Sequence, residues 1–266
     1  MIPELYQIGT VHSALDDPNG MPLGGGEAVI DIDPKYSEGL KRLEEHSHIW
    51  ILTWFHKSNR TTLSVVPAKI DPNLPKYGVF AIRAFMRPNP IGLSRVKLKR
   101  IEGNRIYVSG CDAIDGTPLL DIKSYYEADC VFSPRAPYLR SPDRRMRWEL
   151  MLRQAVDHHQ ETCEGLLLAT RMAFAAEEVF GTPTNPDITV HIQGSPCVAD
   201  AIQGITRARL SNPRRFFFTE QSGPAVTVWE NDRTRLTITD LETGAEYSPD
   251  VADDKLFIIE REEKSS

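Results

Sequence analysis

Long apolar runs, a dense set of cysteines and a G-x-G-x-x-G motif are all missing from this 266-residue sequence. No stretch approaches the ~18 consecutive apolar residues that a membrane-spanning helix needs, so we expect no membrane partner. The first five residues lack the basic-then-apolar layout of a signal peptide, which predicts a cytoplasmic protein. Four cysteines in a chain of this length favour free thiols or metal ligands over a disulfide framework. The G-x-G-x-x-G motif is typical of a Rossmann dinucleotide-binding site, so its absence argues against such a site.

Basic charge is scarce in the second half of the chain. Residues 1–140 carry 17 Lys and Arg against 16 Asp and Glu, a net charge of +1, whereas residues 141–266 carry 14 against 21, a net charge of −7. Nucleic-acid binding depends on the neutralisation of phosphates, so the second half is a poor candidate for a broad RNA-binding surface. Two local arginine clusters remain, and we interpret both as solvated faces: Arg135, Arg140, Arg144, Arg145 and Arg147, and Arg207, Arg209, Arg214 and Arg215.

Short strand patterns separated by Gly, Pro and Asn turns fill the first half, which has no helical pattern of useful length. The run 49–55 is nearly continuous in apolar residues, as expected of a strand that is buried on both faces. The pattern therefore predicts a closed or strongly curved sheet, a β-barrel domain over residues 1–140. A short helix is predicted over 34–45, and strands are predicted over 6–12, 27–32, 49–55, 61–67, 79–83, 94–101 and 105–111.

The spacing of apolar residues changes from a strand-like to a helical period after a proline-rich boundary at residues 133–142. Helices are predicted over 144–157 and 164–179, and strands over 188–192, 215–219, 225–230 and 235–240. Helices followed by an antiparallel meander are typical of an α+β fold, so a second, α+β domain is placed over residues 141–266.

Two stretches of the first half combine turn-forming residues with polar side chains. Arg83 and Arg87 flank a bend that Pro88-Asn89-Pro90 stiffens, and Gly92 permits a close backbone approach. Guanidinium groups suit carboxylates and phosphates. The sequence Asp115-Gly116-Thr117-Pro118 predicts a tight turn that offers a carboxylate, a hydroxyl and exposed backbone amides. Each stretch alone is also an ordinary turn, so neither identifies a site by itself.

The two stretches together resemble the TrmO/TsaA-type family. The resemblance rests on Arg-Pro-Asn-Pro-Ile-Gly-Leu-Ser at 87–94 and Asp-Gly-Thr-Pro-Leu-Leu-Asp-Ile-Lys at 115–123, with support from residues 8–13 and 47–56. It covers roughly residues 1–140. Members are S-adenosylmethionine-dependent methyltransferases that act on N6 of threonylcarbamoyl-adenosine beside the tRNA anticodon. The resemblance implies a non-Rossmann β-barrel, S-adenosyl-L-methionine as cofactor, tRNA as partner and a homodimer.

The resemblance also implies a set of cofactor-binding residues. They are His56, Lys57, Arg83, Arg87, Asn89, Asp115, Gly116, Thr117 and Pro118. Methyl transfer from a sulfonium needs in-line positioning and removal of one proton from the attacking nitrogen. Asp115 and His56 are both catalytic candidates for accepting this proton, and the residues leave the choice open. Relatives commonly carry Pro-Arg-Gln in the loop after the first strand, whereas residues 19–26 of this chain hold no arginine.

A second constellation in the C-terminal half has the composition of a metal site. His159 and Cys163 are four residues apart, so a helical turn puts both on one face, and Cys197 is expected to arrive from a loop. One imidazole and two thiolates form a plausible Zn²⁺ set whose fourth position Glu161 or water would fill. Packing of both cysteines as small hydrophobes is the alternative. The pattern resembles the FmdE-like domain over roughly residues 147–245, which implies His159, Cys163 and Cys197 as ligands.

Two other functions stay open beside a tRNA methyltransferase. Neutral and acidic surfaces and the altered loop favour an S-adenosylmethionine-dependent methyltransferase whose acceptor is a small molecule or metal-chelated metabolite presented by the C-terminal domain. The third is a non-catalytic ligand or metal sensor, against which the retained residues 87–94 and 115–123 argue.

Overall fold

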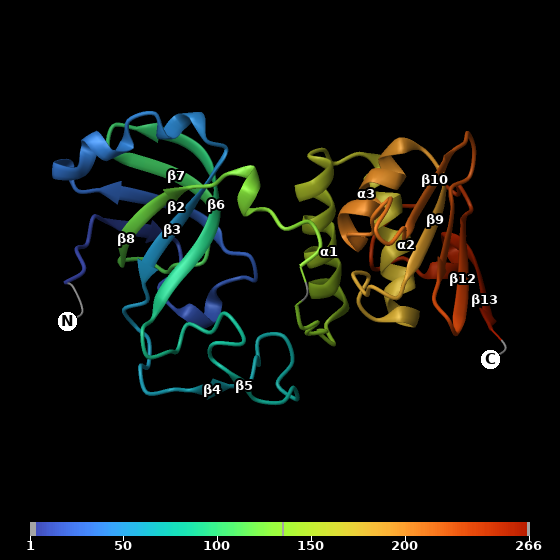
Figure 1. Cartoon of the computed structure of the whole chain (residues 1–266), viewed down its shortest axis with the longest axis horizontal. Helices are drawn as coiled ribbons and strands as arrows, with labels where there is room; N and C mark the ends of the chain where they lie inside the picture. Colours follow the sequence, from blue (N-terminus) through green and yellow to red (C-terminus); the bar gives the residue numbers. More distant parts are fainter. Residues whose placement is uncertain (1–3, 135, 265–266) are drawn as a thin grey trace. The chain divides into compact units, whose positions relative to one another are not determined.

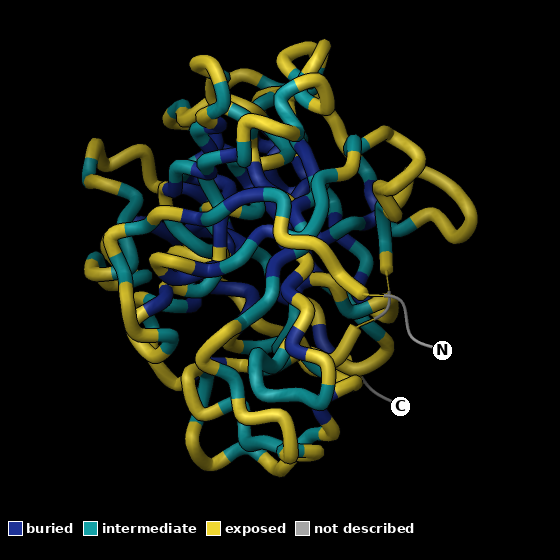
Figure 2. The backbone as a smooth tube through the Cα atoms, turned by 90° about the vertical axis from the view of Figure 1, so that its left-hand side faces the viewer, coloured by how far each residue is buried: buried dark blue, intermediate teal, exposed yellow. Residues whose placement is uncertain are grey.

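The computed structural model describes residues 4–134 and 136–264, and the chain forms two compact units, residues 1–130 and 131–266 (Figure 1). We describe each unit by itself. Buried stretches of the backbone gather in the interior and exposed stretches lie at the periphery (Figure 2), and most buried residues belong to strands and helices. Within the described residues no helix is long and apolar enough to cross a membrane.

The first unit is a closed barrel with the strand order β1-β2-β7-β6-β3-β8, which confirms the predicted closed sheet. All neighbouring strands are antiparallel. Closure leaves no unpaired edge in the barrel wall. The strands are β1 (Gly9–Ser13), β2 (Gly26–Ile32), β3 (His48–Trp54), β6 (Ile91–Glu102), β7 (Arg105–Cys111) and β8 (Thr117–Ser124).

The barrel interior is aliphatic, and the strands alternate between inward and outward side chains. In β3, Ile49, Ile51 and Thr53 are fully buried, whereas Trp50 and Trp54 are only partly covered. The prediction that run 49–55 is buried on both faces is therefore wrong, because a barrel wall has one interior face and the outer face is left to the indole rings. Fully buried aliphatic residues of the core include Val11, Ile30, Ile49, Ile51, Val96, Ile106, Val108 and Leu119.

The segment between β3 and β6 is a long excursion with little regular structure. It holds only β4 (Ser64–Val65) and β5 (Tyr77–Gly78), which pair with each other. The predicted strand 61–67 shrinks to β4, and the predicted strand 79–83 is wrong, because this stretch forms turns. In place of one helix over 34–45 the chain forms the 3₁₀ turns η2 (Pro34–Leu40) and η3 (Leu43–Glu45); shorter 3₁₀ turns are η1 (Pro18–Gly20) and η4 (Glu127–Asp129).

The second unit packs three helices on one face of a five-stranded sheet (Figure 1). The helices are α1 (Arg144–His159), α2 (Glu164–Phe180) and α3 (Pro196–Thr206). The sheet has the order β10-β9-β11-β12-β13. Its strands are β9 (Thr189–Gly194), β10 (Phe216–Glu220), β11 (Val226–Glu230), β12 (Thr234–Asp240) and β13 (Phe257–Glu263), with the 3₁₀ turn η5 (Asp253–Lys255) before β13. The predicted α+β class is confirmed.

The predicted antiparallel meander is only partly correct. Strands β11, β12 and β13 do form one, but β9 and β10 pair in parallel, with the unpredicted helix α3 as the connection between them. A parallel pair needs such a crossover. Strand β13 was also absent from the prediction. The helix α3 begins with Ser195 as its N-cap and Pro196 in its first turn, so residues expected in a loop lie on a helix.

Candidate functional site

Antiparallel strand order brings the predicted cofactor-binding segments of the first unit to one end of the barrel. Strands β1, β3 and β7 end there, and β2, β6 and β8 begin there. Loops 14–25, 55–90 and 112–116 therefore meet at this end, which we call the site end of the barrel. Between them these loops hold all the predicted cofactor-binding residues except Thr117 and Pro118, which begin β8.

The carboxylate of Asp115 is anchored to β1. Its Oδ1 accepts a hydrogen bond of 3.2 Å from the Ser13 N–H and lies 3.4 Å from Nδ1 of His12. The other ring nitrogen of His12 lies 3.5 Å from Oδ2 of Asp31, which Arg105 also contacts. His12 thus joins Asp115 to Asp31. His12 was not among the predicted site residues, and its only signal in the sequence is its place in the family-like stretch 8–13.

The backbone amides of the turn 115–118 are not exposed, contrary to the prediction. Asp115 N–H donates to Leu15 O at 2.7 Å, Gly116 N–H to Val11 O at 2.9 Å and Thr117 N–H to Ile114 O at 3.2 Å. These bonds fix the turn against β1 and the loop after it. A ligand at this turn would therefore meet the Asp115 side chain rather than free amides.

Arg87 organises its own loop. Its Nε donates to Ala84 O at 2.8 Å, and its Nη2 donates to Val79 O at 2.7 Å and Ile82 O at 2.9 Å. The expectation that this guanidinium is available for a carboxylate or phosphate is thus not met by Nε and Nη2. Residues 79–87 have no strand partner, so these bonds replace the missing sheet ladder.

Four of the other predicted residues lie on the loops of the site end. Lys57 Nζ donates to Asp16 O at 2.7 Å and so ties loop 55–90 to loop 14–25. His56, Arg83 and Asn89 are exposed, and none of their side chains has a partner among the described residues. These three side chains are the ones free to contact a ligand.

The packing beneath the site end is tight and contains unused polar atoms. A Cβ on Gly92 would lie 2.4 Å from Thr53 Oγ1 and 2.5 Å from the Phe55 ring, so only glycine fits there. The hydroxyls of Thr53 and Thr117 are buried without a hydrogen-bond partner. Beside His12, on the outer wall, a hollow of about 510 Å³ is lined by Gln7, Gly9, Thr10, His12, Asp31, Ile32, Asp33 and Pro34.

In the second unit, His159, Cys163 and Cys197 lie together. One potential ligand atom from each falls within 4.8 Å of the others. Nε2 of His159 lies 3.4 Å from Sγ of Cys163, which caps α2 by accepting the Leu166 N–H. Cys197 comes from the first turn of α3, not from a loop, which corrects that expectation. Glu161 does not belong to this cluster, which within the described residues has three members.

Charge and hydrogen bonding shift the pKa values of the two thiols in opposite directions. Burial alone would raise the pKa of Cys163, but the Leu166 N–H and the polar contacts with His159 and Cys197 lower it below the usual thiol value. Burial and the neighbouring Cys163 raise the pKa of Cys197. The hydrogen bond to Asp200 raises the pKa of His159. The cluster thus combines an imidazole with one favoured thiolate, which is a donor set that Zn²⁺ accepts.

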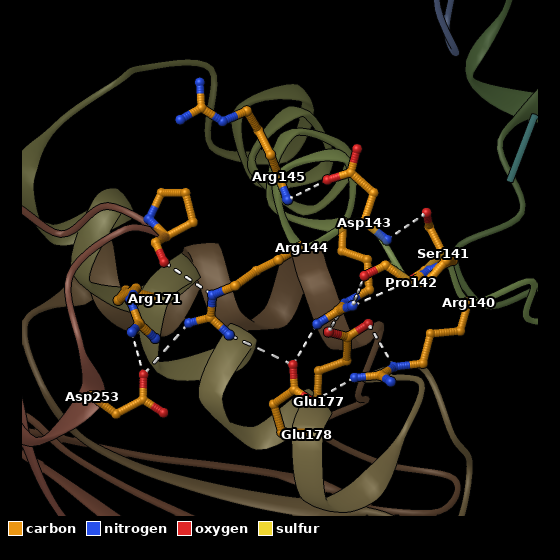
Figure 3. A network of polar contacts seen from close by, with 12 residues as sticks. Arg140, Ser141, Pro142, Asp143, Arg144, Arg145, Arg171, Glu177, Glu178 and Asp253 are labelled. Atoms are coloured by element: carbon orange, nitrogen blue, oxygen red, sulfur yellow. Dashed lines mark hydrogen bonds and ion pairs between the residues drawn. The ribbon is translucent and has the colours of Figure 1, made fainter. Parts of the chain in front are cut away.

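The first arginine cluster is a polar network inside the second unit rather than a free basic face (Figure 3). Arg147 is 8% exposed and binds Glu177 at 2.9 Å as well as Glu178. The interpretation as a solvated face is therefore wrong for Arg147. Nearby, Arg140 binds Glu178, Arg144 lies 3.7 Å from both Glu178 and Asp253, and Arg145 binds Asp250; Arg135 lies outside the described residues.

Some arginines of the second cluster also have partners within the second unit. Arg215 donates to the carbonyls of Asn185 and Ile188, and Arg214 lies over the Phe217 ring at 4.0 Å. Buried Arg147 and half-buried Arg215 thus have partners within the unit, which leaves fewer free charges for RNA than the sequence suggests.

Comparison with known proteins identifies the first unit. Residues 10–130 match the family model of the tRNA-methyltransferase O N-terminal domain. An S-adenosyl-L-methionine-binding protein of Archaeoglobus fulgidus is 42% identical over 132 residues, which are 48% of this chain and 93% of that protein. The chain belongs to the TrmO family. The family model thus covers the strands of the barrel, from β1 to β8.

Other matches extend beyond the barrel. Residues 158–255 match the FmdE family, described as molybdenum formylmethanofuran dehydrogenase operon. A "Probable S-adenosyl-L-methionine-binding protein" of Archaeoglobus fulgidus is 32% identical over 223 residues, 80% of this chain and 60% of the relative. The tRNA (adenine(37)-N6)-methyltransferase of Mus musculus is 42% identical over 142 residues, 52% of this chain and 30% of the relative. The chain thus spans less than two thirds of the length of these two TrmO-family relatives.

Proposed function

We propose that this chain is an S-adenosylmethionine-dependent methyltransferase that methylates N6 of threonylcarbamoyl-adenosine in tRNA, in the cytoplasm. The carrying observation is the convergence of loops 14–25, 55–90 and 112–116 on one barrel end, around the anchored carboxylate of Asp115. A similar protein of Mus musculus is a tRNA (adenine(37)-N6)-methyltransferase, which supports tRNA as the substrate class.

The residues at the site end have different proposed roles, according to whether their side chains are free to contact a ligand. When bound, S-adenosyl-L-methionine supplies an electrophilic methyl group on a sulfonium. Arg83 and Asn89 are free to hold a carboxylate, while the fixed turn 115–118 presents the carboxylate of Asp115. We assign Asp115 as the acceptor of the proton that leaves the attacking nitrogen, since His12 and the Ser13 N–H hold it in place. With Asp115 as the proton acceptor, the role left for His56 is to contact the substrate or the cofactor.

Methyl transfer to tRNA is tested with purified protein, S-adenosyl-L-methionine and tRNA from cells that lack the protein. We expect nucleoside mass spectrometry to find one added methyl group on threonylcarbamoyl-adenosine. The Asp115→Asn variant, with an amide in place of the carboxylate, is the matched comparison and should methylate far less of the nucleoside in the same time. An unmethylated nucleoside with the wild-type protein, at saturating cofactor, would contradict the proposed substrate.

A small-molecule acceptor is the second candidate, and the commitment of Arg147 and Arg215 to internal partners favours it. Under this alternative, wild-type protein binds S-adenosyl-L-methionine but does not modify tRNA. Calorimetry with S-adenosyl-L-methionine, measured on the same wild-type protein, therefore separates a wrong substrate from a wrong activity.

We also propose a homodimer through the outer wall of the barrel. Leu52 and Trp54 on β3 neighbour Leu93 and Ile91 on β6, and the two β6 residues are 45% and 39% exposed. These four residues form an outward apolar strip, and such exposed strips are typical of protein–protein interfaces.

Light scattering is expected to give twice the chain mass for the wild-type protein. Leu93→Glu should shift the protein to a monomer, because a charge would be buried in the interface. Thr219→Glu, which adds the same charge to an exposed strand of the second unit, should leave the dimer intact. A monomer at every concentration for the wild-type protein would rule out this assembly.

We propose that the second unit binds one divalent transition metal, with Zn²⁺ as the candidate, through His159, Cys163 and Cys197. The support is the mutual proximity of the three donor atoms. Elemental analysis of protein purified without chelators or a His tag should find about one equivalent of metal. Cys197→Ala should lose it, and Cys130→Ala, which removes an exposed thiol outside the cluster, should keep it.

Metal content below about a tenth of an equivalent in the wild-type protein would contradict the metal site and support the alternative, in which Cys163 and Cys197 pack as small hydrophobic side chains. In that case Cys197→Ala changes stability without changing metal content.

A further inference from the structure

We propose that Asp200 positions His159 for the transition metal, so that α3 supplies both a ligand, Cys197, and the carboxylate that orients the imidazole. The inference rests on the metal-binding function proposed above and goes beyond it. It concerns a residue that does not itself reach the donor cluster but fixes the direction in which one donor points.

The hydrogen bond between Asp200 and His159 sets the orientation of the ring. Oδ2 of Asp200 lies 2.6 Å from Nδ1 of His159. An ionised carboxylate only accepts hydrogen bonds, so Nδ1 of the neutral ring carries the proton and Nε2 keeps its lone pair. Nε2 is the atom that lies 3.4 Å from Sγ of Cys163. The free lone pair of His159 is thus the one on the side of the thiols.

A second contact holds the carboxylate in turn. Oδ1 of Asp200 lies 3.3 Å from Nε2 of His158, the neighbour of His159 at the end of α1. Both oxygens of Asp200 are therefore directed at α1. Asp200 follows Cys197 by three positions on α3, so the two residues share one face of the helix. One turn of α3 thus contributes the sulfur and the positioning group.

Two glycines allow the helices to approach this closely. A Cβ on Gly204 of α3 would lie 2.5 Å from Cβ of His158, and a Cβ on Gly165 of α2 would lie 2.8 Å from Cβ of Cys197. Contacts below 3.0 Å are not tolerated between such atoms, so both positions require glycine. The cluster is thus held by α1, α2 and α3 together, which is the preorganisation that a metal site needs.

A carboxylate behind a ligating histidine has a known effect on metal affinity. It fixes the ring and raises its basicity as a ligand, and loss of such a partner typically lowers metal affinity about 10–100-fold. The competing explanation is that Asp200 is only an ion-pair clamp between α1 and α3. A clamp would contribute to the stability of the metal-free protein but would leave the metal affinity of the three donors unchanged.

The test measures Zn²⁺ affinity of the full-length protein by competition with a chromophoric chelator. It is combined with the electronic spectrum of the Co²⁺-loaded protein and with the melting temperature of the metal-free protein. We expect Asp200→Ala to lower Zn²⁺ affinity about 10–100-fold while the thiolate-to-cobalt bands persist. Asp200→Asn keeps an acceptor oxygen without the charge and should lie between Asp200→Ala and the wild type. Asp254→Asn, an exposed carboxylate remote in sequence, is the control and should bind as the wild type does.

The outcomes separate this inference from the function on which it depends. Wild-type protein that binds no metal would overturn both. Metal binding by the wild type that Cys197→Ala abolishes, together with unchanged affinity in Asp200→Ala and Asp200→Asn, would overturn the role of Asp200 alone. If Asp200→Ala does not fold, the Asn variant carries the decision, since it preserves shape and hydrogen bonding.

Discussion

Asp115→Asn is expected to lower kcat/KM for methyl transfer about 10²–10⁴-fold, the usual contribution of a positioned general base. The amide cannot take a proton from the attacking nitrogen, but its oxygen can still accept the Ser13 N–H that anchors the carboxylate at 3.2 Å. The turn itself should therefore persist, because its three amides bond to backbone carbonyls and not to this side chain. Steady-state kinetics with radiolabelled cofactor measures the loss.

Cofactor binding distinguishes a proton acceptor from a binding residue. Calorimetry should find S-adenosyl-L-methionine affinity changed little in Asp115→Asn and lowered in Arg83→Ala, because only the second loses a cationic contact. His56→Ala is the matched comparison for catalysis, since the sequence left His56 and Asp115 as alternatives. A larger kcat loss in His56→Ala than in Asp115→Asn would reverse our assignment of the two roles.

His12 provides a further check on the position of Asp115. His12→Gln keeps a hydrogen-bond donor near Asp115 but breaks the link from Asp115 to Asp31. A fall in kcat without a change in cofactor affinity would place His12 behind the proton acceptor. Equal activity of wild type and variant would show that the Ser13 N–H alone is sufficient.

The barrel was predictable because its signals are local. Alternating apolar residues and Gly, Pro and Asn turns predicted β2, β3 and β7 within one or two residues. Strand β8 was not predicted because Leu119 and Leu120 break the alternation of apolar and polar residues. The register of β3 and β8 shifts at the same place, between Leu52 and Thr53. The helix α3 was not predicted, because its first turn contains Pro196 and Cys197 and was interpreted as a loop that carries a metal ligand.

The candidate sites were predictable as residue sets but not as arrangements. Ser13 and Asp115 are 102 positions apart, and nothing in either segment reveals their hydrogen bond. Arg87 looked like a ligand-binding group because composition cannot show that backbone carbonyls have already taken its donors. The same reason hid the burial of Arg147 beneath its partners on α2. Long-range partners decide which charged side chains remain free for a ligand.

Arg147→Met is expected to lower the free energy of unfolding by about 3–5 kcal/mol, the usual cost of removing one partner from a buried ion pair. Glu177 is 1% exposed at its side chain and lies 2.9 Å from Nε of Arg147, so water cannot replace the lost cation. Without Arg147, the carboxylate keeps Arg140, at 3.7 Å, and the Tyr138 hydroxyl, but it loses its nearest cation. Arg147 Nη1 also donates to Ser141 O at 2.9 Å, and this bond would be lost as well. Urea denaturation monitored by the fluorescence of Trp148 and Trp229, both in the core of this unit, measures the change.

Two further variants decide whether charge burial is the cause. Arg145→Met removes a cation from the same helix, but its pair with Asp250 is 68% and 71% exposed, so the loss should stay below about 1 kcal/mol. The double variant Arg147→Met with Glu177→Gln removes both buried charges and should recover much of the lost stability, since no unpaired charge is left. If the double variant is less stable than Arg147→Met alone, the network of Figure 3 stabilises the fold through its hydrogen bonds, and the argument from an unpaired charge is wrong.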